Sequence, residues 1–85
     1  MYYLYVLKSI GKDWHYIGVT SDIEKRVAEH NSGKVRSTKP HRPLRLVYHE
    51  TFSNNKEARK KESFLKRTAQ ARQSIFQKIR NGAIV

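Results

Sequence analysis

The sequence contains no cysteine, few acidic residues and no long apolar run. Without cysteine, neither disulfides nor a thiolate-bound zinc ion can hold so short a chain together, so hydrophobic packing must do so. No stretch approaches the ~20 apolar residues that span a bilayer, and the N-terminus lacks the pattern of a secretory signal. We therefore expect a cytoplasmic protein with no membrane partner. A chain of 85 residues is expected to form one domain, residues 1–85, because a core of this size cannot be divided.

The shortage of acids makes the chain strongly basic. Seven Asp and Glu stand against 18 Lys and Arg, for a formal net charge of +11 and a pI near 10.3. Residues 33–45 carry no acid, and Glu62 is the only acid after Glu57. This charge predicts a polyanionic partner, because phosphate contacts release counterions and dominate affinity for nucleic acids. On composition alone, a merely soluble basic surface or a ribosome- or membrane-associated one is the alternative.

Hydrophobic patterning predicts three strands. Residues 2–8 and 14–19 are aromatic and β-branched runs on either side of a turn-like segment, which predicts an antiparallel hairpin. Residues 44–51 alternate between apolar and more polar side chains, apart from Val47, and predict the third strand.

Capping signals and apolar spacing predict three helices. Ser21 with Glu24, and Asn54 with Glu57, match the capping box, and apolar residues at helical spacing follow each pair. A spacing of four residues continues the apolar pattern near the C-terminus. These patterns predict helices over about residues 22–31, from 54 to a bend near Thr68, and from Ala71 toward Asn81.

Two tripeptides mark the hairpin: Tyr3-Leu4-Tyr5 and, ten residues later, Tyr16-Ile17-Gly18. An arginine and a histidine follow in the first helix, then a basic loop, and then a glutamate within EARKKESFLK. From Tyr3 to about Lys66 this order resembles the GIY-YIG nucleases, with Tyr3 where the family usually has glycine. The resemblance is to small stand-alone, single-domain members related to the N-terminal domain of the excinuclease.

Tyr5 and Tyr16 lie on neighbouring strands, where paired side chains have Cβ atoms only ~5 Å apart, so both phenols can reach one pocket. Two packing aromatics are the preferred interpretation of the residues alone. The resemblance reverses that preference and implies that one of the two tyrosines orients or deprotonates the attacking water. Gly18 allows close approach of a strand or a phosphate, but a structural role before the turn is favoured.

Arg26 and His30 are four residues apart and therefore share one face of the first predicted helix. Arginine can hold a phosphate through two hydrogen bonds, and histidine titrates near neutrality. Solvation of Arg26 and capping of the helix end by His30 are the structural alternatives. The resemblance implies that Arg26 is catalytic and makes His30 a further catalytic candidate.

Glu62 is a lone carboxylate in a basic segment. It has two interpretations: a local ion pair, for example with Lys66 at four-residue spacing, or an inward ligand for a hard cation. The resemblance favours the second and implies one Mg²⁺ or Mn²⁺ held by Glu62. Glu57 and Glu50 are weaker candidates.

The basic loop has two interpretations as well. Its cations serve solubility, or they grip the nucleic-acid backbone beside the scissile phosphate, which two basic segments around one site favour. The candidate nucleic-acid-binding residues are Lys34, Arg36, Lys39 and Arg42.

The resemblance implies a small α/β domain with a three-stranded antiparallel or mixed sheet flanked by helices. The implied function is a metal-dependent endonuclease that hydrolyses phosphodiester bonds in DNA, with a role in DNA repair. RNA is not excluded, and structure-selective or single-strand-directed cleavage is suggested because the chain shows no attached specificity domain. A monomer is expected, with a homodimer as the alternative. The competing function is a non-catalytic nucleic-acid-binding module of the same fold, or an RNA-associated accessory protein.

Overall fold

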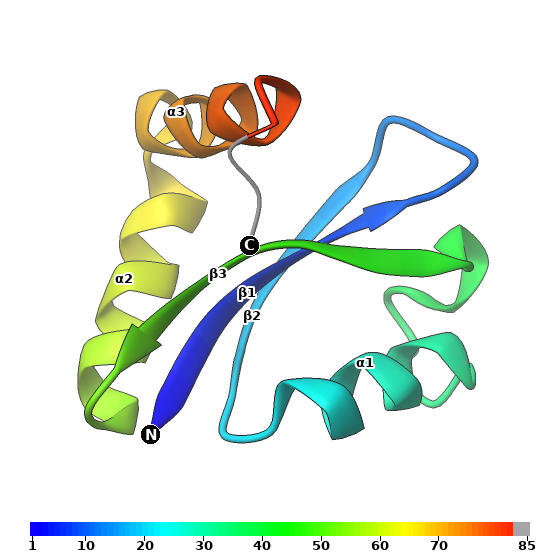
Figure 1. Ribbon diagram of the computed structural model, residues 1–85, viewed down its shortest axis with the longest axis horizontal. Coiled ribbons are helices and arrows are strands. Elements are labelled where there is room, and N and C mark those ends of the chain that lie inside the picture. Colours follow the sequence, from blue (N-terminus) through cyan, green and yellow to red (C-terminus); the bar gives the residue numbers. More distant parts are fainter. Residues whose placement is uncertain (83–85) are drawn as a thin grey trace.

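The computed structural model describes residues 1–82, which form three strands and three α-helices (Figure 1). Each predicted element is present, with bounds within two residues of those expected. A short 3-10 helix (Lys39–His41) lies in the basic loop, and the predicted bend falls at Thr68. The elements are β1 (Tyr2–Ser9), β2 (His15–Thr20), α1 (Ile23–Asn31), β3 (Leu44–Phe52), α2 (Asn55–Arg67) and α3 (Ala69–Arg80).

The sheet is antiparallel throughout and has the order β2-β1-β3. Because β1 is the central strand and is covered on both faces, its sequence is a nearly continuous apolar run instead of an alternating one. A β-bulge between Val6 and Leu7 places Val47 as an extra residue in β3. The bulge accounts for the break in alternation at Val47, since one added residue turns the following side chains to the opposite face.

Side chains cap α1 and α2 at their N-termini. In α2, Asn54 Oδ1 accepts a hydrogen bond from the Glu57 backbone N–H at 2.9 Å, as predicted. In α1 the predicted cap, Ser21, is wrong, because Asp22 Oδ1 accepts from the Lys25 backbone N–H at 3.2 Å. The helix starts one residue later than the capping pattern suggested, and a carboxylate at this position also interacts favourably with the helix dipole.

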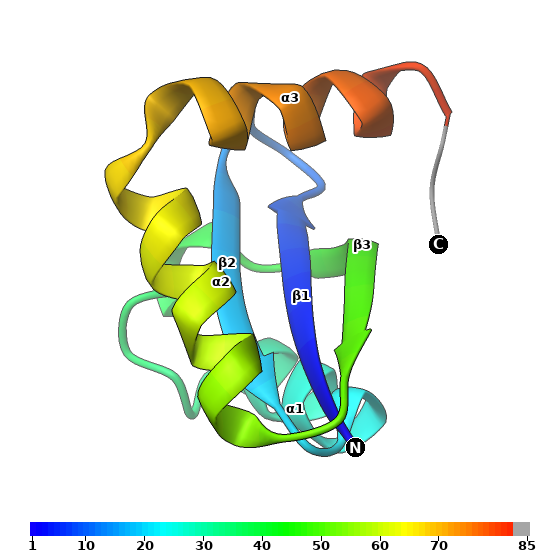
Figure 2. The same ribbon diagram turned by 90° about the vertical axis from the view of Figure 1, so that its left-hand side faces the viewer.

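Helices cover both faces of the sheet (Figure 2). α2 and α3 contribute Leu65 and Ile75 to the core on one face, whereas α1 contributes Val27 to the opposite face. α3 lies across the ends of β1 and β2, next to the hairpin turn (Figure 2). None of the helices in residues 1–82 combines the length and apolarity needed to cross a membrane.

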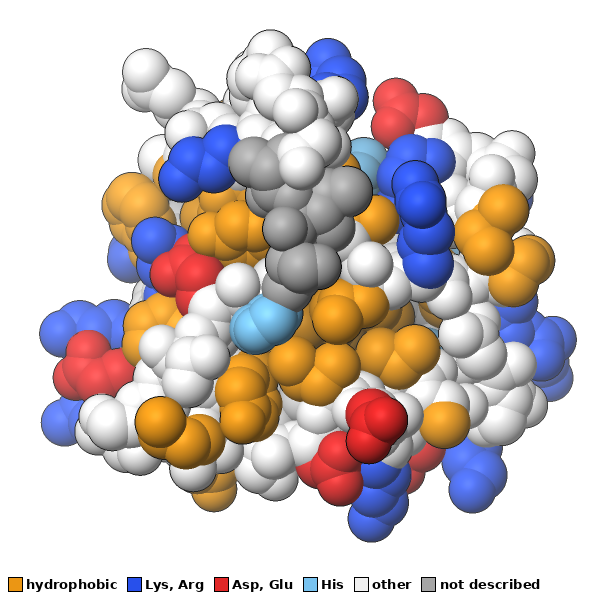
Figure 3. All heavy atoms as spheres, in the orientation of Figure 1, with side chains coloured by type: hydrophobic (Ala, Val, Ile, Leu, Met, Phe, Trp, Pro, Cys, Tyr) orange, Lys and Arg blue, Asp and Glu red, His pale blue; other side chains and the backbone are white. Residues whose placement is uncertain are grey.

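The charged side chains lie mainly around the rim of the face shown in Figure 3, and hydrophobic side chains gather near its middle. The basic residues therefore surround the molecule on this side instead of forming one isolated tip.

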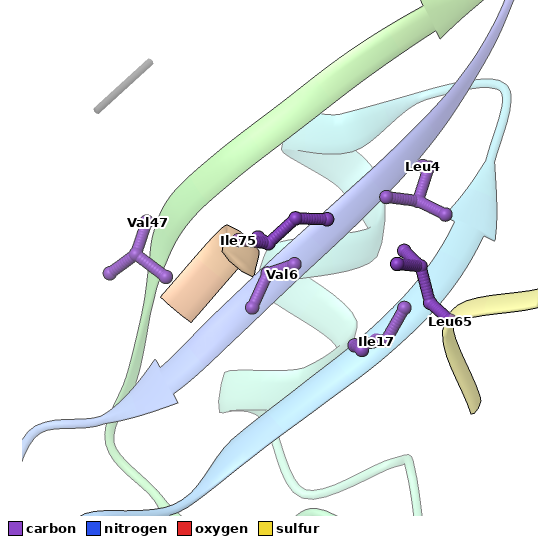
Figure 4. Packing of buried hydrophobic residues seen from close by; sticks show 6 residues of the cluster. All are labelled: Leu4, Val6, Ile17, Val47, Leu65 and Ile75. Atoms are coloured by element: carbon purple, nitrogen blue, oxygen red, sulfur yellow. The ribbon is translucent and has the colours of Figure 1, made fainter. Parts of the chain in front are cut away.

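The main core lies between the sheet and the pair α2 and α3 (Figure 4). Each fully buried aliphatic side chain contributes ~1.5–3 kcal/mol relative to an exposed one, which gives a chain without disulfides its stabilising core. The six buried residues of this cluster are Leu4, Val6, Ile17, Val47, Leu65 and Ile75.

Candidate active site

Tyr5 and Tyr16 lie on the same face of the hairpin, with ring centroids 6.2 Å apart. Tyr5 is paired with Gly18 in the sheet and Tyr16 with Leu7, so the two tyrosines are diagonal neighbours. Gly18 makes room for them, because a Cβ there would lie 2.6 Å from the Tyr5 hydroxyl and 3.0 Å from the Tyr16 ring. The expected structural role of Gly18 is therefore to let two phenol rings pack over the strand.

Tyr5 is almost fully buried and belongs to a hydrogen-bonded chain with His30 and Thr38. The Tyr5 hydroxyl lies 2.9 Å from His30 Nε2, and His30 Nδ1 lies 2.8 Å from Thr38 Oγ1. Thr38 donates its own hydroxyl proton to the Val35 carbonyl, so its oxygen accepts a hydrogen bond from His30 Nδ1. Nε2 of neutral His30 is then the acceptor, and Tyr5 donates its proton to it.

Burial holds both groups of this chain in their neutral forms. It raises the pKa of Tyr5 to about 12, and the nearby Tyr16 adds to this shift while Arg26 opposes it. Burial likewise lowers the pKa of His30, with a further decrease caused by the positive charge of Arg26. Tyr5 is therefore a hydrogen-bond donor near neutrality and not a base.

Arg26 extends from α1 toward the same cluster. Its guanidinium donates hydrogen bonds to the Tyr5 oxygen and, at 3.1 Å, to Glu29 Oε1. Two fixed partners hold the guanidinium in one orientation, although its side chain remains 36% exposed. The shared helix face predicted for Arg26 and His30 thus faces Tyr5.

Glu62 reaches the cluster from α2, on the edge of the sheet formed by β2. Its carboxylate pairs with Lys66 at 3.3 Å and with Arg59 at 3.9 Å, and its side chain is only 16% exposed. Its charge contributes to the raised pKa of Tyr5, and Lys66 Nζ lies 5.9 Å from the centre of the Tyr16 ring. Glu62 therefore lies beside both tyrosines.

Two hollows flank Glu62. Arg59 lines one of about 510 Å³ together with Lys25 and Arg26, whereas Lys66 lines one of about 390 Å³ together with Tyr16. Arg59, Glu62 and Lys66 form one stripe on α2, since residues three and four apart share a helix face. The stripe places the carboxylate between two cation-lined depressions.

The donor set suits a cation that keeps most of its water. Among residues 1–82, no group of three or more His, Asp or Glu side chains is arranged to hold a metal ion. Mg²⁺ is nevertheless often bound by one or two carboxylates, with waters and substrate phosphate oxygens completing its coordination. Glu62 alone fits that pattern.

The candidate nucleic-acid-binding residues lie in the loop between α1 and β3. Lys34, Arg36 and Lys39 are exposed, whereas Arg42 folds back on its own loop. Arg42 Nε donates to the Lys39 carbonyl at 3.0 Å, and its guanidinium packs over Gly33, whose positive φ of 86° favours glycine. The loop is thus an ordered segment with three outward-facing cations.

Three residues of the site escaped prediction. Thr38 lies in the basic loop, and nothing in its local sequence indicates that it contacts a helix eight residues earlier. Glu29 orients Arg26, and its three-residue spacing from Arg26 was a usable signal. The spacing of Lys66 indicates only an ion pair with Glu62, but Lys66 also faces the Tyr16 ring.

The fold and this cluster define a GIY-YIG domain, and the chain belongs to that nuclease family: the family model for the GIY-YIG catalytic domain matches residues 1–75. Its relatives include the UPF0213 protein YazA of Bacillus subtilis (strain 168), 36% identical over 76 residues that cover 88% of this chain and 76% of the relative. The UPF0213 protein SSP2268 of Staphylococcus saprophyticus is 43% identical over 67 residues, or 76% and 79% of the two chains.

A solved structure has a similar fold. The solution NMR structure of the UPF0213 protein BH0048 from Bacillus halodurans matches with a TM-score of 0.55 and 28% identity, covering 92% of this chain and 83% of that one. The expected family and α/β fold are therefore confirmed.

Proposed function

We propose that the protein is a metal-dependent endonuclease that hydrolyses phosphodiester bonds in DNA. The observation that carries the proposal is the convergence of Tyr16, Arg26 and Glu62, from β2, α1 and α2, around the buried Tyr5. A solvated phenol, a fixed guanidinium and a carboxylate are the groups that in-line hydrolysis of a phosphodiester requires.

Tyr16 is the residue that orients the attacking water and accepts its proton. Unlike Tyr5, it is only half-buried and lines an open hollow, so water and substrate can reach its hydroxyl. A free phenol has a pKa of ~10, so a tyrosine base needs a neighbouring positive charge. Lys66, whose Nζ lies 5.9 Å from the centre of the Tyr16 ring, supplies that charge.

Arg26 binds the scissile phosphate and offsets the negative charge that builds on it in the transition state. Tyr5, His30 and Thr38 act through Arg26: their hydrogen-bonded chain fixes the Tyr5 oxygen, which in turn helps to orient the guanidinium. His30 is fully buried, so its part in the reaction is to position Tyr5 and not to contact the substrate.

Glu62 is the residue that holds the metal ion. When bound, Mg²⁺ or Mn²⁺ supplies positive charge to the phosphate and its leaving oxygen. Glu62 provides a nearly buried carboxylate, and Lys66 and Arg59 keep that carboxylate in place by ion pairs.

A cleavage assay tests the proposal. Labelled single-stranded, duplex, flapped and branched DNA is incubated with the protein in Mg²⁺, Mn²⁺ or chelator. Glu62→Gln should slow cleavage at least ~100-fold, a barrier increase of ~2.7 kcal/mol, while binding DNA as well as the parent or better. Glu57→Gln is the matched control, since it removes the same charge from an exposed position of the same helix and should cleave at the parental rate.

The outcome separates an enzyme from a binding module. Parental cleavage by Glu62→Gln would remove Glu62 as the metal ligand. A parent protein that binds DNA but is inactive on every substrate with either metal would favour a non-catalytic nucleic-acid-binding module, in which Glu62 serves only its two ion pairs.

A further inference from the structure

A hollow of about 390 Å³ lies beside the candidate active site, between β2, the α2–α3 bend and α3 (Figure 2). Its volume falls within the ~300–1,000 Å³ that small-molecule sites occupy. Tyr16 and Lys66 belong both to this hollow and to the candidate active site. Beyond these two residues, its lining includes Trp14, Phe76, Arg72 and Asp13.

The aromatic side chains of the hollow are held in place by other rings. Trp14 stacks on His41, with ring centroids 3.7 Å apart and planes 7° apart. Phe76 of α3 stacks in the same way on His15, with centroids 4.3 Å apart. These stacks fix flat apolar surfaces at the hollow, at little further cost in conformational entropy when a ligand binds.

Cations lie next to these aromatic surfaces. Arg72 Nη1 donates hydrogen bonds to the Leu65 and Lys66 carbonyls at 3.0 and 2.9 Å, which anchors the guanidinium at the α2–α3 bend. Lys66 lies at the boundary with the candidate active site. Asp13 is the acid of the lining, and it is exposed at the hairpin turn.

We propose that this hollow binds an unpaired nucleobase next to the scissile phosphate, so that the protein selects single-stranded nucleic acid. The proposal rests on the proposed function, because Tyr16 and Lys66 link the hollow to the reacting phosphate. Aromatic side chains beside a cationic path are the usual means of holding single strands, since every base has a π-face to stack. Arg72 and Lys66 contact the flanking phosphates.

Pairing excludes a base from such a site. In a duplex, each base is stacked on its neighbours, and only its edges are accessible in the grooves. A base must leave the stack, at a cost of a few kcal/mol, before aromatic side chains can contact its face, and it does so most readily when it is already unpaired. The hollow therefore distinguishes strands by the availability of a base face and not by their charge.

Trp14 is the only tryptophan of the chain and reports directly on the hollow. The parent protein, in chelator and at fixed salt, is titrated with a single-stranded oligodeoxynucleotide, with a strand of the same length whose sites are all abasic, and with a blunt duplex. The base-bearing strand should quench Trp14 fluorescence and bind at least ~10-fold more tightly than the abasic strand, or ~1.4 kcal/mol. The abasic strand and the duplex should bind through phosphates without quenching.

A pair of phenylalanine variants locates the effect. Phe76→Leu keeps apolar packing but removes a stacking surface, so it should weaken the base-bearing strand ~10-fold and leave the abasic strand unchanged. Phe64→Leu is the control, because Phe64 is 44% exposed on α2 and lines a different depression. Equal affinity and equal quenching for base-bearing and abasic strands would overturn the proposal, and this comparison needs no variant.

The result is independent of catalysis. Quenching that requires bases, without cleavage of any substrate in Mg²⁺ or Mn²⁺, would support the base site and contradict the proposed endonuclease. Cleavage without any effect of the bases on affinity or fluorescence would do the reverse. A matched RNA strand that quenches when the DNA strand does not would keep the base site but contradict DNA as the substrate.

Discussion

Tyr5 and Tyr16 share one face of the hairpin but differ in their partners and in their access to solvent. Tyr5 is 1% exposed and donates its proton to His30, and burial raises its pKa to about 12. Tyr16 lines an open hollow beside Lys66. Environment alone therefore separates a structural phenol from the one that can meet water and substrate.

At Gly18, the expected effect of a single methyl group is large. Gly18→Ala would place a Cβ 2.6 Å from the Tyr5 hydroxyl, so either the ring or the strand must shift. Overpacking of this kind costs ~1–3 kcal/mol, and a loss of 1 kcal/mol lowers the Tm of a domain of this size by ~4–8 °C. Thermal unfolding followed by circular dichroism measures the change. Gly11→Ala, at a position with no neighbour within 4 Å, is the control and should leave the Tm nearly unchanged.

His30 should make stability depend on mildly acidic pH. Its pKa is lowered in the folded protein, chiefly by burial, so below ~6.5 the unfolded chain binds a proton that the folded chain does not. The stabilisation is fully present above that pH and is lost as the pH falls. The Tm of the parent should decrease between pH 7.5 and 5.

Replacing His30 isolates its share of this pH dependence, because His15 and His41 also have lowered pKa values. His30→Gln should show a smaller difference in Tm between pH 7.5 and 5 than the parent, even if it is less stable at both. An equal difference would mean that His30 already carries a proton in the folded state.

At the scale of elements, the basic loop is attached to α1 through one hydroxyl. Thr38→Val keeps the shape of the side chain but leaves the buried His30 Nδ1–H without its acceptor, which costs ~1–3 kcal/mol. We expect a lower Tm and, because Tyr5 and Arg26 lose their support, slower cleavage. Thr38→Ser retains the hydroxyl and should stay close to the parent in both measurements. If Val and Ser variants behave alike, the hydrogen bond has no role in holding the loop.

The elements were predictable because local signals agree with the fold. The apolar run of β1, the cap at Asn54 and the stop near Gly33 each depend on neighbouring residues alone. Contacts that cross between elements were not predictable in this way. The bond from Thr38 to His30 and the stack of Trp14 on His41 depend on how a loop folds back, which periodicity does not encode.

The site could be predicted in outline for the same reason. Tyr5, Tyr16, Arg26 and Glu62 matched a family order, and the structure brings all four together. Their division of roles was out of reach, because burial decides it and a sequence does not show which of two neighbouring tyrosines is covered.

Across the whole molecule, the net charge of +11 should make nucleic-acid binding strongly salt-dependent. For single strands, log K against log salt should fall with a slope of about −0.7 for each phosphate contacted. Affinity that does not change between low and moderate salt would rule out phosphate contacts as the source of binding. Fluorescence anisotropy of a labelled strand, measured in chelator over a range of salt concentrations, gives the slope.

The basic loop should account for a defined part of that slope. Replacing Lys34, Arg36 and Lys39 with Gln removes three outward-facing charges, so the slope should become shallower by up to about 2 if each cation contacts one phosphate. The control is a triple Gln variant of Lys56, Lys60 and Lys78, which are also exposed and lower the net charge by the same amount. If the loop contacts the strand, only the first variant changes the slope strongly, whereas equal changes would mean that the protein attracts nucleic acid by its overall charge. Because neither triple alters Tyr16, Arg26 or Glu62, cleavage at saturating DNA should stay near the parental rate in both.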